Sequence, residues 1–190
     1  GDVYKRQISI CIISLFVTFV MITGGIDIQA GSIVGLSSIV LGVAWQDGGM
    51  NIWAAVALAV VVAGVCGALS GYFVAYCGVQ PMVVTLGGSF LFTGVALLVS
   101  NLSATESYKG ISGFPDSFLQ LSKFKLFGVI PCQVIIFLVL AVIAYVLLNK
   151  TKYGRMVFLI GVNKDAAEFS GINTRLITMT TVSYTHLTLP

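Results

Sequence analysis

Long apolar stretches alternate with shorter polar segments along most of this chain. A helix that crosses a membrane needs about 20 mostly apolar residues. The pattern therefore predicts an all-α fold, a polytopic transmembrane helical bundle. The predicted spans are residues 8–22, 32–45, 52–77, 81–100 and 127–148, with the start of another at residue 176.

The composition excludes an ordinary soluble domain. Hydrophobic residues make up 57% of the chain and charged residues only 9%, whereas about a quarter of the residues of a soluble domain are charged. Between Gln7 and Glu106 the only formal charges are Asp27 and Asp47. The net charge of +3 is small and gives no support for a nucleic-acid partner.

Both ends break the pattern beside them. Residues 1–7 (GDVYKRQ) and residues 183–190 (SYTHLTLP) resemble translated sequencing-adapter sequence, and we expect both to be artefacts. Residues 8–182 are then a transmembrane domain, expected to be an internal fragment of a longer protein.

The chain has no sequence signature of an enzyme. It contains no G-x-x-x-x-G-K-[ST], H-E-x-x-H or G-x-S-x-G motif, so no ATPase or hydrolase site is predicted. A membrane enzyme is also disfavoured, because it would need clustered polar residues that this sequence does not show. We expect no metal site and no cofactor, because the four cysteines form no C-x-x-C pair and there is one histidine. The cysteines are interpreted as small buried hydrophobic residues.

The segment GGIDIQAGS, which starts at Gly24, interrupts the first apolar stretch. Glycine costs a helix about 1 kcal/mol relative to alanine, so Gly24 and Gly25 predict a break and place Asp27 in a non-helical turn. One interpretation is a polar turn at the membrane surface. The other is irregular backbone at membrane depth, which is tolerated where it lines a cavity.

Two later spans carry glycine pairs. Pro81 is a helix-start signal, and Gly87 and Gly88 mark a weak point in the helix that follows. Gly67 and Gly71 form a G-x-x-x-G pair that lets another helix approach closely.

Charge is dense only in residues 149–175. There Asn163 is a plausible N-cap, Asp165 lies in the first turn and Gly171 can end the helix, which predicts a helix of about two turns. Its small and apolar surface would come from Ala166, Ala167, Phe169 and Ser170. The segment either lies in the lipid headgroup region or docks a partner.

Basic residues set the predicted orientation. Residues 149–175 carry Lys150, Lys152, Arg155, Lys164 and Arg175, against three lysines in the loop of residues 100–126. Basic residues prefer the cytoplasmic side, so residues 163–171 are predicted inside and the loop outside. Alternation then places residues 78–80 inside, 46–51 outside and 24–30 toward the inside.

Several of these segments resemble permease subunits of ATP-binding-cassette importers of the carbohydrate branch. DAAEFSG, from Asp165 to Gly171, is similar to the EAA-xxx-G coupling helix, with aspartate in place of glutamate. GGIDIQAGS is similar to GGIDLSVGS, with Gln29 and Ala30 replacing Ser and Val. PMVVTLGG is similar to P-x-x-V-T-L-G, although Thr93-Gly94 replaces the following R-G. The likeness covers most of residues 8–182 and includes the pentose and, most closely, the autoinducer-2 import permeases.

The resemblance assigns two groups of residues. It implies that an ATPase-contacting coupling helix contains Asn163, Lys164, Asp165, Ala166, Ala167 and Gly171. It also implies a substrate pathway that includes Gly24, Gly25, Asp27, Thr85 and Gly87.

The implied function is import of a sugar or sugar-like small molecule, a pentose or autoinducer-2, across the bacterial inner membrane. The implied partners are ATPase subunits, a second permease subunit, the same or homologous, and a periplasmic or lipoprotein solute-binding protein. ATP hydrolysis would then occur on a partner chain. The alternative is a secondary active transporter, which would need intramembrane ion-coupling residues and inverted repeats.

Overall fold

The computed structural model describes residues 2–102, 125–126 and 130–187. Helices account for most of these residues, so the predicted all-α class is confirmed apart from one pair of two-residue antiparallel strands. The helices are α1 (Asp2–Ile22), α2 (Ala30–Gln46), α3 (Ile52–Ala75), α4 (Pro81–Leu102), α6 (Cys132–Lys150), α7 (Lys152–Val162), α8 (Lys164–Phe169) and α9 (Thr174–Leu187). The strands are β1 (Lys125–Leu126) and β2 (Ile130–Pro131).

Within the described residues, two helices are long and apolar enough to cross a membrane, α3 and α4 over residues 81–101. A third candidate is the pair formed by residues 134–150 and α7, which is bent by 71°. The apolar parts of α1 and α2, Gln7–Ile22 and Ala30–Gln46, are shorter than these candidate spans. The six predicted spans therefore stay predictions, as do the two predicted adapter-derived ends, whose described residues fall in α1 and α9. Most of the predicted external loop, including GISGFPDSF, lies outside the described residues.

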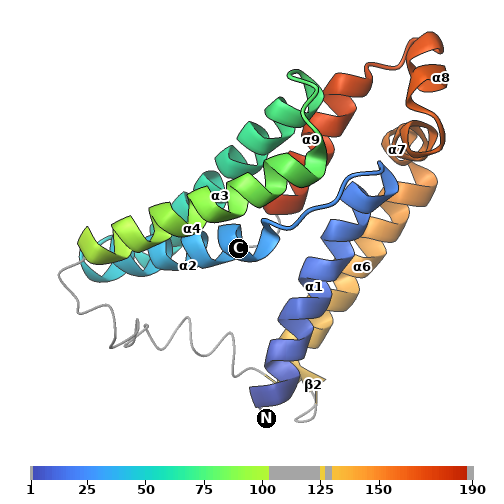
Figure 1. The fold of residues 1–190 in the computed structure, drawn as a ribbon. Coiled ribbons are helices and arrows are strands. Elements are labelled where there is room, and N and C mark those ends of the chain that lie inside the picture. The colour runs from blue at the N-terminus through green and yellow to red at the C-terminus, as the bar shows by residue number, and fades with distance from the viewer. Residues whose placement is uncertain (1, 103–124, 127–129, 188–190) are drawn as a thin grey trace.

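The helices form two groups (Figure 1). In one, α2 packs against α3 and α4, and α9 runs along α3. In the other, α1 lies beside α6. The connection from α1 to α2 passes between the groups, and α7 and α8 lie at the end of the α1 and α6 pair where that connection begins (Figure 1).

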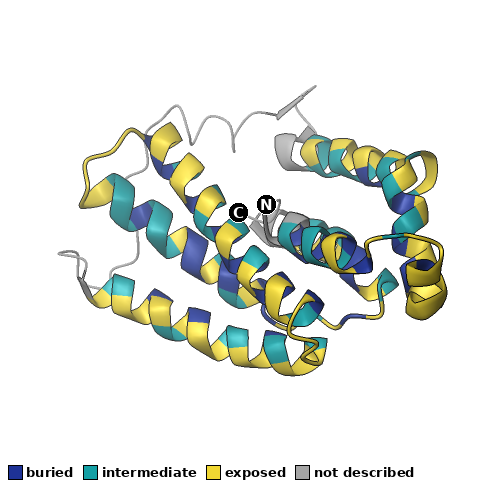
Figure 2. Cartoon of the chain, turned by 90° about the horizontal axis from the view of Figure 1, so that it is seen from above, coloured by how far each residue is buried: buried dark blue, intermediate teal, exposed yellow. Residues whose placement is uncertain are grey.

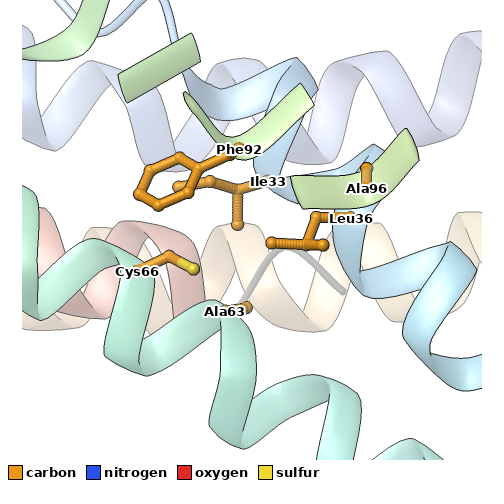
Figure 3. Packing of buried hydrophobic residues seen from close by; sticks show 6 residues of the cluster. All are labelled: Ile33, Leu36, Ala63, Cys66, Phe92 and Ala96. Carbon is orange, nitrogen blue, oxygen red and sulfur yellow. The ribbon is translucent and has the colours of Figure 1, made fainter. Parts of the chain in front are cut away.

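A compact apolar cluster joins α2, α3 and α4. Figure 3 shows its members, Ile33, Leu36, Ala63, Cys66, Phe92 and Ala96. Cys66 packs there as a small hydrophobic residue, as predicted. Cys11 and Cys77 are exposed, so the prediction that they are buried was wrong. Cys77 lies in the turn after α3, and Cys11 lies on an outward face of α1.

Much of the helical surface is exposed (Figure 2), and many of its exposed side chains are large and apolar. On α4, for example, Phe90 is 73% exposed and Leu98 is 65% exposed. Such a surface in a soluble protein would mark a contact with another protein or with a membrane. In this chain it is the surface expected to face lipid or further helices.

Close helix packing depends on Gly71. A Cβ atom built on Gly71 would lie 2.9 Å from the carbonyl oxygen of Met179 in α9. The prediction that the G-x-x-x-G pair lets a helix approach closely is therefore confirmed at Gly71.

Two local predictions differ from the structure. Helix α4 runs unbroken through Gly87 and Gly88, so the predicted weak point does not break it. Helix α7 was not predicted. It begins after Thr151, whose Oγ1 accepts a hydrogen bond from the backbone N–H of Gly154 at 3.2 Å, and this cap turns the chain away from α6.

Candidate functional site: a cavity beside a short helix

The chain leaves helical geometry between α1 and α2, as the glycines predicted. Gly24 has a φ of 78°, a left-handed conformation that glycine adopts without steric cost. Asp27 then accepts a hydrogen bond at Oδ1 from the backbone N–H of Gln29 at 3.2 Å. This is an Asx-type turn, which stabilises the irregular backbone with a local side chain. We call residues 23–29 the broken segment.

Two hydroxyl groups on other helices hold the broken segment in place. Thr85 of α4 donates a hydrogen bond from Oγ1 to the carbonyl oxygen of Ile26 at 3.0 Å. Ser70 of α3 donates from Oγ to Oε1 of Gln29 at 2.9 Å. The Gln29 side chain is fully buried, so its amide depends on partners within the protein. Gly88 of α4 makes room for it, because a Cβ atom there would collide with Gln29 Oε1.

A cavity of about 230 Å³ lies beside the broken segment. Its walls come from the broken segment, the ends of α1 and α3, the turn before α4, the starts of α4 and α8, and α7 and α9. Its polar lining residues are Thr23, Asp27, Ser70, Gln80, Thr85, Lys164 and Thr178. The volume is below the roughly 300 Å³ at which pockets for drug-sized ligands begin, so the cavity suits a small molecule.

The structure brings three of the predicted pathway residues to this cavity. Gly25, Asp27 and Thr85 line it together. Gly25 lies so close to α1 that a Cβ atom there would be 2.9 Å from a methyl group of Val20. Gly24 and Gly87 do not line the cavity. Gly24 makes the turn, and a Cβ atom on Gly87 would meet open space.

Sequence reasoning missed Thr23, Ser70 and the structural role of Gln29. The available signal was polarity, because Ser70 is a polar residue within an otherwise apolar helix and is only 4% exposed. A buried hydroxyl requires a partner, but the sequence does not reveal that the partner is Gln29, which is far away along the chain. Within the described residues, no group of His, Cys, Asp and Glu could hold a metal ion.

The predicted short helix is present as α8. Asn163 caps it, accepting a hydrogen bond at Oδ1 from the backbone N–H of Ala166 at 3.0 Å. Asp165 lies in its first turn. Gly171 has a φ of 80°, and the next residue, Ile172, donates its backbone N–H back to the carbonyl of Ala167 at 3.2 Å. These contacts match the predicted start and end.

The two faces of α8 differ from the expected surface in one respect. Ala167 is 3% exposed and packs against Val157, Ile160 and Ile177. It therefore holds α8 onto α7 and α9, and the expectation that Ala167 offers outward surface was wrong. Phe169 is 93% exposed, and Ala166 is also exposed. The outward face thus combines an unsupported aromatic ring with the carboxylates of Asp165 and Glu168.

Comparison with known proteins identifies the family. Residues 4–185 match the family described as "Branched-chain amino acid transport system / permease component". The chain belongs to this family. The resemblance to importer permeases predicted from the sequence is confirmed at that level, and the family is one of transport components rather than of enzymes.

The permease is also similar to individual curated proteins. It is 41% identical over 165 residues to "Autoinducer 2 import system permease protein LsrD" of Yersinia enterocolitica, an alignment that covers 87% of this chain and 49% of the relative. The same figures apply to the proteins of that name from Yersinia pestis and Yersinia pseudotuberculosis. The chain spans about half the length of these relatives. No solved structure matches it significantly.

Proposed function

We propose that this permease is the membrane-spanning subunit of an ATP-binding-cassette importer that moves a sugar or sugar-like small molecule into the cytoplasm. The observation that carries the proposal is the cavity beside the broken segment. Seven polar side chains of the described residues line it although the helices around it are largely apolar, and ionisable groups that face the interior of a membrane protein or a water-filled cavity generally mark a transport path.

The size and chemistry of the cavity suit a small polyhydroxylated ligand. Its volume is about 230 Å³, and it offers hydroxyl, amide, carboxylate and ammonium groups. The relatives are named as autoinducer-2 import permeases. We therefore infer autoinducer-2 or a pentose as the substrate, with Gly25, Asp27 and Thr85 along its path.

Helix α8 is proposed to dock the ATPase. Its outward face carries Phe169, an aromatic ring of the kind that anchors protein interfaces. Its first residue, Lys164, lines the cavity together with Asp27 and Thr85. A displacement of α8 by a bound ATPase would therefore move part of the cavity wall, which is a direct route from ATP binding to the substrate path.

The same arrangement supports the proposed orientation. Three of the segments that line the cavity are residues 23–27, residues 78–81 and the start of α8. The distribution of basic residues independently assigns these segments to the cytoplasmic side. We propose that the permease is a multi-pass protein of the bacterial inner membrane, with α8 in the cytoplasm.

The remaining proposed partners are a second permease subunit and a solute-binding protein on the outer side. The exposed apolar side chains of α4, including Phe90 and Leu98, provide surface for either lipid or a second subunit.

One observation favours the alternative, a secondary active transporter. Asp27 is an acidic side chain in the cavity, and such groups can couple transport to an ion gradient. The two functions differ in whether a stable ATPase partner exists.

Co-purification tests the proposal. The full-length permease, extracted in mild detergent from its own bacterium, should retain an ATP-binding-cassette ATPase subunit and show ATP hydrolysis in the purified complex. A permease that purifies without an ATPase, and whose uptake in vesicles follows an ion gradient, would establish the alternative.

A further inference from the structure

Three of the hydroxyl groups that line the cavity, those of Thr23, Ser70 and Thr85, donate their protons to acceptors within the protein. Thr23 donates from Oγ1 to the carbonyl oxygen of Val20 at 2.7 Å. Thr85 donates to the carbonyl oxygen of Ile26 at 3.0 Å. The direction of both bonds is fixed, because a carbonyl oxygen can only accept. Ser70 donates in the same way to Gln29 Oε1 at 2.9 Å.

These internal hydrogen bonds determine which hydrogen bonds the hydroxyl groups can still form with a ligand. A hydroxyl has one proton and two lone pairs, so a hydroxyl that has donated its proton can only accept a further hydrogen bond. The Asp27 carboxylate, which lines the same cavity, also accepts. Thr23, Asp27, Ser70 and Thr85 therefore form a set of acceptors, which we call the acceptor wall; all four line the cavity.

We propose that the acceptor wall selects ligands by their hydrogen-bond donors: the cavity takes a neutral polyhydroxyl molecule whose adjacent O–H groups point at Thr23, Asp27, Ser70 and Thr85. The inference rests on the proposed function, and it adds which chemical feature of the substrate the cavity recognises, namely its hydrogen-bond donors. A ligand that presents ether oxygen, fluorine or carbonyl oxygen to this wall forms no hydrogen bond with it, which lowers the affinity relative to a ligand that presents a hydroxyl.

The other polar residues of the cavity complete the set. Lys164 brings donors only, and Gln80 and Thr178 can donate or accept. A sugar hydroxyl can donate to the acceptor wall and accept from Lys164 at the same time. A group that only accepts can pair with Lys164, Gln80 or Thr178 but not with the acceptor wall.

Gln29 and Gly88 keep the Ser70 hydroxyl an acceptor toward the cavity, because they fix the direction of its hydrogen bond. The Gln29 oxygen takes the Ser70 proton, and the missing side chain at Gly88 leaves the space that this oxygen occupies. Gln29 is therefore a positioning residue, which acts on the ligand through Ser70.

The test uses the full-length permease with its partners in lipid nanodiscs and a reporter cysteine at Thr178→Cys, with the native cysteines replaced. The rate of alkylation by a small neutral thiol reagent is measured against increasing D-ribose and against its singly fluorinated 2-deoxy-2-fluoro and 3-deoxy-3-fluoro analogues. Fluorine keeps the size of the hydroxyl but cannot donate. Val74→Cys, which also lines the cavity, is the second reporter should the first variant not fold. Gln46→Cys, at the end of α2, reports effects of sugar that do not involve the cavity.

D-ribose should protect both reporters and leave Gln46→Cys unaffected. At least one fluorinated analogue should need a roughly 3- to 10-fold higher concentration for the same protection, the cost of an unpaired acceptor. In a Thr85→Val background, which has no Oγ1, the difference should shrink, and in the matched Thr85→Ser background it should persist.

Equal protection by D-ribose and both analogues, or no protection by D-ribose, would overturn the inference. ATP-driven uptake of D-ribose is scored separately. Uptake without discrimination would leave the proposed function standing without the acceptor wall. Discrimination without uptake would leave the acceptor wall standing without the proposed function.

Discussion

Asp27 is the residue at which the surface-turn and permeation-path interpretations of the broken segment diverge. Its carboxylate stabilises the turn through the Gln29 N–H and also lines the cavity. Because it does both, its substitution separates the interpretations only if transport and assembly are measured independently.

We expect Asp27→Asn to reduce uptake roughly tenfold while the complex still assembles. Asparagine keeps the size and one acceptor oxygen, but it replaces a charged acceptor with an N–H₂ donor, and hydrogen bonds to charged groups are the stronger kind. Uptake into proteoliposomes and co-purification of the ATPase are the two measurements. Asp47→Asn, at the end of α2 and outside the cavity, is the matched control and should transport like the wild type. If the two variants transport equally well, Asp27 is only a turn residue.

Gly87 and Gly88 offer a test of how Gln29 is held. Alanine at Gly88 would collide with Gln29 Oε1, whereas alanine at Gly87 would meet open space. We expect Gly88→Ala to lower the free energy of unfolding by about 1 to 3 kcal/mol, the usual cost of overpacking. Gly87→Ala should be neutral or raise it by up to about 1 kcal/mol, because alanine is the better helix former.

Thermal unfolding of the two purified variants in detergent measures the difference. The sequence alone treats these adjacent glycines as equivalent. Identical melting temperatures would show that Gln29 does not occupy the space above Gly88.

At the scale of single elements, α8 has an inner face and an outer face. Ala167 packs inward against α7 and α9, while Phe169 is almost fully exposed. The two residues therefore test different properties of the same helix.

We expect Phe169→Ala to leave the permease folded and to weaken ATPase binding about tenfold or more, as loss of an interface anchor does. Ala167→Arg should instead lower the free energy of unfolding by on the order of 3 kcal/mol, because it buries an unpaired charge. ATPase binding by pull-down and unfolding in detergent are measured for both variants. Normal ATPase-coupled uptake by Phe169→Ala would rule out docking through the outer face of α8.

The start and end of α8 were predictable because its cap and its final glycine act within a few residues of one another. Helix α7 was not predicted, although the sequence contains its N-cap residue Thr151 and its apolar positions Tyr153, Val157 and Ile160. The charged residues around it made the segment resemble a loop. Its buried face is defined by contacts with α8 and α9, which the sequence of α7 alone does not reveal.

At the scale of the whole molecule, the predicted orientation determines which engineered cysteines an impermeant thiol reagent can label from each side of the membrane. With native cysteines replaced, Ser112→Cys should react with the reagent added outside the cell. Glu168→Cys on exposed α8 should react only when the reagent has access to the cytoplasmic face of the membrane. Intact cells and inverted vesicles provide the two conditions. The reverse pattern would invert the orientation and remove α8 from reach of a cytoplasmic ATPase.

The arrangement of the helices was less predictable than their existence. Hydrophobic periodicity and glycine breaks indicated the break at Gly24 and the helix start at Pro81, because both signals are local. The cavity was not predictable as a whole, since it depends on contacts such as Thr85 with Ile26 and Ser70 with Gln29 that join distant parts of the chain. Gly25, Asp27 and Thr85 entered the candidate site through family resemblance, and packing then brought them together.

The most direct test of the importer function is uptake in a defined system. The full-length permease is reconstituted into proteoliposomes with its ATPase and solute-binding protein, and accumulation of labelled autoinducer-2 and D-ribose is measured with and without ATP. We expect accumulation of at least one of them against its gradient that requires ATP and the binding protein and is unaffected by collapse of proton and sodium gradients. Accumulation that proceeds without ATP and stops when the ion gradients collapse would contradict this function.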